Sequence, residues 1–103
     1  MKNSIRVRTE QKAEVTEVKM LIRHPMETGL RKDSKTGELV PAHFITEVVC
    51  KHNDADVFTA YWGIAVSKNP FLSFTLDEVK PGDVLAISWQ DNKGGSDSVV
   101  VDI

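Results

Sequence analysis

Short runs in which apolar and polar residues alternate recur along the whole chain. Within residues 14–23, Val18, Met20 and Ile22 alternate with Lys19 and Arg23, which is the period of a half-buried strand. Further β-rich runs of strand length are 4–8, 43–51, 57–62, 71–77, 83–90 and 97–103. The pattern therefore predicts seven strands.

A helix is the alternative for residues 10–23, because Glu and Lys are good helix formers. The alternation from Thr16 to Arg23 fits a period of two better than 3.6. A strand is therefore the prediction here too.

Turn signals separate the runs. HNDAD follows residue 51, Pro81-Gly82 precedes the sixth run, and DNKGG joins the last two runs. Three sets of residues share strand faces and supply facing layers of one core: Leu85, Ile87 and Trp89; Leu72, Phe74 and Leu76; and Phe44, Val48 and Cys50. Since no helical pattern separates the strands, we predict an all-β, antiparallel sandwich of the immunoglobulin-like class.

The length and charge of the chain limit the classes of partner that it could bind. The 103 residues suit a single domain over 1–103, and the net charge of −2 with a pI near 5.9 lacks the basic excess of a nucleic-acid binder. The longest apolar runs are far shorter than the roughly 20 residues that span a bilayer, so no membrane partner is expected. The start, MKNSIRVRTE, lacks the apolar core of a secretory signal. We therefore expect a cytoplasmic protein or one exported by another component.

One connection, residues 24–42, is unusually long for a compact domain, and such loops tend to be functional or disordered. Its second half, DSKTGEL, is typical of a solvated hairpin tip. Its first half, HPMETGLR, combines an imidazole, a thioether, a carboxylate and a guanidinium. Two interpretations stay open: a functional surface, or a structural turn in which Pro25 ends the strand, Gly29 permits the turn and Met26 packs beneath it.

Catalytic and metal-binding patterns are weak. Cys50 is expected on the apolar face and His52 in an exposed turn, which argues against a nucleophile and base. His24, His43, His52 and Cys50 are scattered and lack zinc-type spacing. The acidic residues of the turns and Gly94-Gly95 fit solvated turns better than an acid and base pair or a phosphate cradle. We predict no catalytic residue, no metal and no cofactor.

Specific strings along the chain resemble the SoxZ family of sulfur-oxidation proteins. HPMETGLRKD at 24–33 is the most specific, and KNPFLSF at 68–74 and ISWQDNKG at 87–94 follow in the same order and spacing. The resemblance extends from IRVR at 5–8 to the final VVVDI. It implies an immunoglobulin-like, noncatalytic subunit that pairs with SoxY as a heterodimer or heterotetramer, while SoxY carries the sulfur on the cysteine of its C-terminal arm.

The resemblance also implies transient contacts with other Sox enzymes, and a periplasmic location reached by export together with the signal-bearing partner. Exposed apolar strand residues, such as Leu21 and Val49, are further candidates for the partner contact. The residues that we predict to bind the partner come from the long loop and from two strands: His24, Pro25, Met26, Glu27, Thr28, Gly29, Arg31, Tyr61 and Phe71.

Two other classes remain as alternatives. An immunoglobulin-like metal enzyme resembling superoxide reductases needs four histidines and one cysteine, and this chain has three histidines. An independent immunoglobulin-like adhesion or binding module would have similar strands but gives no reason for HPMETGLRKD.

Overall fold

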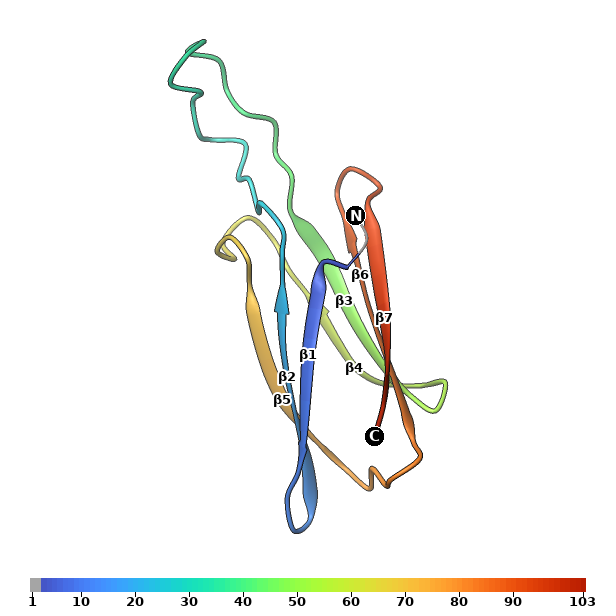
Figure 1. Cartoon of the computed structure of the whole chain (residues 1–103). Coiled ribbons are helices and arrows are strands. Elements are labelled where there is room, and N and C mark those ends of the chain that lie inside the picture. Colours follow the sequence, from blue (N-terminus) through green and yellow to red (C-terminus); the bar gives the residue numbers. More distant parts are fainter. Residues whose placement is uncertain (1–2) are drawn as a thin grey trace.

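The computed structural model describes residues 3–103, which form seven strands and, within that range, no helix (Figure 1). The strands are β1 (Ile5–Gln11), β2 (Val15–Ile22), β3 (Ile45–His52), β4 (Ala55–Tyr61), β5 (Phe71–Asp77), β6 (Val84–Asp91) and β7 (Ser96–Asp102). Consequently, the described residues contain no helix that could cross a membrane. The predicted number of strands is confirmed.

The strands pair antiparallel in two sheets. One sheet has the order β1-β2-β5 and the other β4-β3-β6-β7. Compared with the constant-type immunoglobulin arrangement, the fourth strand pairs with the third instead of joining the three-stranded sheet. The predicted all-β sandwich is therefore confirmed, with an immunoglobulin-like strand order.

The core lies between the sheets and uses the faces expected from the alternation. Val18, Met20 and Ile22 of β2 pack with Leu85, Ile87 and Trp89 of β6, all at most 1% exposed. Val48 and Cys50 are buried as predicted, and the aromatic rings of Phe58 and Phe74 stack at 4.4 Å between edge strands β4 and β5. Phe44 only lines the core, because it precedes β3 and its backbone bonds to Asn92.

The turn between β3 and β4 is tighter than predicted. Asn53 and Asp54 both have positive φ, as the central residues of a two-residue hairpin turn of the I′ type require. As a result β4 begins at Ala55, inside the stretch predicted as turn. The expected exposure of His52 is wrong: it is partly buried, and its Nε2 lies 2.7 Å from a carboxylate oxygen of Asp83.

The long connection forms a paired extension, which we call the arm (residues 24–43). Glu27 and His43 exchange two backbone hydrogen bonds, and further out the N–H of Val40 donates to the carbonyl of Arg31. The tip closes where the N–H of Gly37 donates to the carbonyl of Asp33. Figure 1 shows the arm projecting beyond the end of the sandwich, which accounts for an overall length of 53 Å against widths of 22 and 20 Å.

Candidate functional site

A buried aspartate joins both ends of the arm to the sandwich. Asp91 closes β6, and its Oδ2 lies 3.0 Å from Nε2 of His24 and 2.7 Å from Nε2 of His43. The side chains of His24 and Asp91 are 0% and 1% exposed, and that of His43 is 21% exposed. Since His24 follows β2 and His43 precedes β3, one carboxylate fixes both strands of the arm at its base. We call these three residues the arm anchor.

The hydrogen bonds define the proton positions on His24. The backbone N–H of Met26 donates to its Nδ1 at 3.1 Å, so Nδ1 must present a lone pair. The ring proton therefore resides on Nε2 and is donated to Asp91. Burial, the largest influence, lowers the pKa of His24, and its bond to Asp91 opposes that shift. His24 is thus a neutral imidazole with both nitrogens satisfied.

Asp91 is held as a carboxylate. Burial acts to raise its pKa, but hydrogen bonds from His24 and His43 and from the N–H groups of Gly95 and Lys93 outweigh that and lower the pKa to about 2. These backbone donors explain why the turn after β6 needs glycine: a Cβ on Gly95 would lie 2.7 Å from Oδ2 of Asp91. Gly95 therefore does more than allow a turn.

Backbone contacts strengthen the arm base. The side chain of Asn92 donates to the carbonyl of Ala42 and accepts from the N–H of Phe44. On the other strand of the arm, Asn69 accepts from the N–H of His24 and donates its own N–H to the carbonyl of His24. The arm is thus fixed by the turns on both of its sides.

Met26 and Gly29 follow the structural interpretation of HPMETGLR. Met26 is 5% exposed, and its sulfur accepts a hydrogen bond from the N–H of Ile45 at 3.3 Å. Gly29 has a φ of +85°, and a Cβ there would meet Ala42 at 3.1 Å, so glycine is required at this close approach of the two arm strands. Both residues shape the arm.

Glu27 and Arg31 form an ion pair on the arm surface. The guanidinium of Arg31 makes bonds of 2.8 to 3.1 Å to both carboxylate oxygens of Glu27. The bond from Arg31 lowers the pKa of Glu27 and in turn raises the pKa of Arg31. The Arg31 side chain is 60% exposed and Glu27 20%, so this pair presents charge to solvent in a fixed geometry.

The structure brings two histidines together that the sequence predicted to be scattered. His24, His43 and Asp91 offer ligand atoms within 4.8 Å of one another, whereas His52 bonds to Asp83 instead. A metal on Nε2 of His24 would move its proton to Nδ1, directly against the N–H of Met26. The donors and acceptors of the arm anchor therefore suit hydrogen bonding better than metal ligation.

Chemical catalysis gains no support from the arm anchor. A histidine held by a buried aspartate is part of many nucleophilic sites, but these also need a hydroxyl or thiol at the imidazole. Among residues 3–103, the side chains of His24 and His43 form hydrogen bonds with Asp91 and with the backbone N–H of Met26. Cys50 lies in the core on β3, where it pairs with Phe58 of β4 and Ile87 of β6.

The predicted partner-binding residues fall into two groups. His24 and Met26 are buried in the described structure, where both hold the arm base. The others keep accessible surface: Pro25, Glu27, Thr28 and Gly29 are partly buried, while Arg31, Tyr61 and Phe71 are exposed. Whether these bind a partner stays a prediction.

Exposed apolar side chains are concentrated at the end of the molecule that carries the arm. All the large exposed apolar residues among residues 3–103, except Val57 and Val100, lie on the arm or where the strands approach it. They are Leu21, Leu30, Leu39, Tyr61, Ile64 and Phe71. Leu21 and Phe71 belong to the three-stranded sheet and Tyr61 to the four-stranded sheet, so these residues form more than one patch. Exposed apolar patches are typical of sites that bind other proteins.

Comparison with known proteins agrees with this architecture. The model of the family described as sulphur oxidation protein SoxZ matches residues 5–102, from the start of β1 to the end of β7. The search of curated proteins found no match. Because the family match covers nearly the whole chain, the chain belongs to the SoxZ family, which implies a role in Sox sulfur oxidation.

Proposed function

We propose that this chain is the noncatalytic subunit of a SoxYZ carrier complex, in which SoxY bears the sulfur on its C-terminal cysteine. The observation that carries the proposal is the concentration of exposed apolar side chains beside the arm of a SoxZ-family sandwich. An obligate partner interface has an apolar centre and polar rim. Tyr61 and Ile64 supply apolar surface here, and the Glu27–Arg31 pair supplies polar groups.

Co-purification tests the proposal. Coexpression with a tagged SoxY from the same source should give a stoichiometric complex, measured by size exclusion with light scattering. Tyr61→Ser should weaken that complex about tenfold, because buried tyrosines contribute strongly to interfaces. Val100→Ser is the matched control, since Val100 is 64% exposed but lies on β7 away from the arm. A chain that elutes alone at every concentration would contradict the proposal and favour the independent binding module.

The arm pair has its own expected result. Glu27→Ala and Arg31→Ala should leave the melting temperature nearly unchanged, because an ion pair this exposed to solvent adds little to stability. Both should impair thiosulfate oxidation in a reconstituted Sox system, since the fixed charges then no longer meet the partner or the visiting enzymes. Lys35→Ala, at the exposed arm tip, is the control. Loss of the fold in either variant would instead support a purely structural role.

The periplasm is the proposed location, because the Sox system is generally periplasmic and this chain would be exported together with its signal-bearing partner. Fractionation of cells that express the chain with and without SoxY tests this. Recovery from the periplasm should depend on SoxY and on its signal peptide.

A further inference from the structure

An open groove of about 270 Å³ lies on the outer face of the three-stranded sheet. Its lining residues are Arg6, Arg8, Lys19, Met20, Leu21 and Phe71. Strand register explains why they meet. Arg6 is opposite Leu21, which is opposite Phe71, and the next row on this face pairs Arg8 with Lys19. Two cross-strand rows thus place three cations around an aliphatic and an aromatic side chain.

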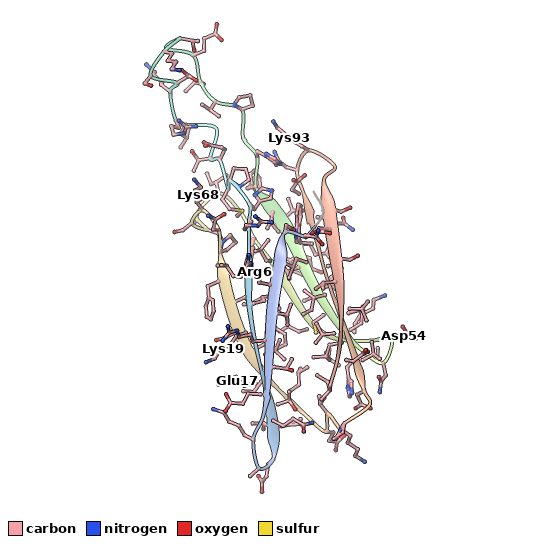
Figure 2. The ribbon with its side chains drawn as sticks, in the orientation of Figure 1. Arg6, Glu17, Lys19, Asp54, Lys68 and Lys93 are labelled. Atoms are coloured by element: carbon pink, nitrogen blue, oxygen red, sulfur yellow. The ribbon has the colours of Figure 1, made fainter. Side chains whose placement is uncertain are left out.

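Two of the three cations of this groove, Arg6 and Arg8, are not neutralised by the residues that the structure describes. Arg6 and Arg8 are exposed and make no ion pair with any residue among 3–103, whereas Lys19 lies 3.1 Å from Glu17. Figure 2 shows Arg6, Lys19 and Glu17 in this order down the sheet, away from the arm. On this face of the sheet, going away from the arm, the first acidic residues are Glu10 and Glu17, which pair in the row after Arg8 and Lys19. A basic patch therefore stands on a chain whose net charge is −2.

We propose that this groove docks an acidic protein segment that places one apolar side chain between carboxylates. The apolar side chain packs on Phe71 and Leu21, and the carboxylates pair with Arg6 and Arg8. This proposal deepens the proposed function and rests on it, because it assigns the segment to an enzyme that visits the carrier complex.

The chemistry of the groove favours a protein surface that binds transiently. Arginine and aromatic residues are enriched at protein interfaces, and paired guanidinium groups recognise carboxylates in fixed geometry. The groove is open to solvent along the sheet face, so it would not enclose a small metabolite. A bound metabolite normally has most of its surface buried in its pocket. Exposed charges chiefly raise the association rate and make it depend on salt, which suits an enzyme that must leave after each turnover.

A peptide titration tests the groove directly. The acetylated, amidated peptide EDFDE is added to the isotope-labelled full chain and followed by amide NMR shifts, with QNFNQ as the uncharged control. We expect shifts at residues 6, 8, 19, 21 and 71, and binding that weakens about tenfold between 20 and 200 mM salt. The variant Arg6→Glu/Arg8→Glu should abolish these shifts, whereas Lys80→Glu, remote from the groove, should not.

The titration can overturn the proposal in several ways. They are no binding of EDFDE, equal binding of QNFNQ, shifts confined to other surfaces, and undiminished binding by Arg6→Glu/Arg8→Glu. Anionic lipid vesicles are tested in parallel, and binding to vesicles without binding to EDFDE would assign the groove to a lipid surface instead.

The assembled complex separates this proposal from the proposed function. In complex with SoxY, Arg6→Glu/Arg8→Glu should leave the mass of the complex unchanged while raising the KM of a visiting Sox enzyme for the loaded carrier about tenfold at low salt, with kcat retained. An unchanged KM for every visiting enzyme would overturn the assignment to visitors. If no complex with SoxY forms in the wild type, the proposed function fails, while the peptide titration still decides the chemistry of the groove.

Discussion

Replacing Asp91 with alanine should lower the free energy of unfolding by about 3 to 5 kcal/mol. The change leaves the Nε2 proton of His24 without an acceptor in a site where that side chain is 0% exposed. It also removes the acceptor of His43 and of the backbone N–H groups of Lys93 and Gly95. Urea denaturation of the purified chain, or of its complex, measures the loss.

Asp83→Ala is the matched control for this prediction. Asp83 also bonds a histidine Nε2 at 2.7 Å, and its pKa is likewise lowered to about 2, with the N–H of Lys80 as the largest cause. Its side chain is 21% exposed, so water can replace the lost bonds, and we expect a clearly smaller loss of stability than for Asp91→Ala. Equal losses of stability in Asp83→Ala and Asp91→Ala would contradict the prediction that burial makes the loss of Asp91 more costly.

The arm anchor should also make stability depend on pH in a defined direction. The pKa of His24 is lower in the folded state than its ordinary value of 6.5, so the unfolded chain binds more protons. Stability from this group is therefore full above pH 6.5 and declines below it. Asp91, with a pKa of about 2 against 3.8 when unfolded, adds a second loss as the pH falls from about 4 to 2. Asp91→Ala should lack the part of this second loss that comes from Asp91, while Asp83, whose pKa is also lowered to about 2, keeps its own part.

The strands could be predicted from the sequence because burial on one face imposes a period of two. Val18, Met20 and Ile22 illustrate this, since every one is buried while Lys19 and Leu21 between them are exposed. The start of β4 was missed because HNDAD contains turn-forming residues throughout. Only the backbone reveals that Asn53 and Asp54 alone make the turn.

The arm anchor was missed for a different reason. His24, His43 and Asp91 are 19 and 48 residues apart, and a sequence holds no direct signal for contacts at that separation. One clue was present: His24 follows one strand, His43 precedes the next, and Asp91 ends a third. Strand ends that meet at one edge of a sandwich can share a partner, but which ends meet depends on the strand order. That order follows from tertiary packing and has no local sequence pattern.

Burial of His24 also changes how the HPMETGLR string is understood. The variety of functional groups in this string suggested direct contact with a partner. The imidazole of His24 and the thioether of Met26 nevertheless turn inward and hold the arm. Glu27 and Arg31, further along the same string, turn outward. The two interpretations of this loop therefore apply to different residues of it, and the rigid base is what allows the outer pair to keep a fixed geometry.

Cys50 is expected to resist alkylation in the native protein by at least about 100-fold relative to the urea-unfolded chain. The side chain is 0% exposed, and burial raises the pKa of its thiol from 9.0 to about 11. At pH 8 this shift alone reduces the reactive thiolate about 100-fold, and the rate should rise about tenfold per pH unit as long as the fold persists. Iodoacetamide labelling followed by intact mass measures it.

An inert Cys50 is also what the proposed carrier complex requires. Thiol exchange proceeds through a thiolate, so a second reactive thiol in the proposed complex would compete with the SoxY cysteine for the cargo. Thr59→Cys provides the control, because Thr59 is exposed on β4 and its thiol should be labelled rapidly while Cys50 in the same molecule is not. Rapid native labelling of Cys50 would contradict its place in the core and would give this chain a redox role of its own.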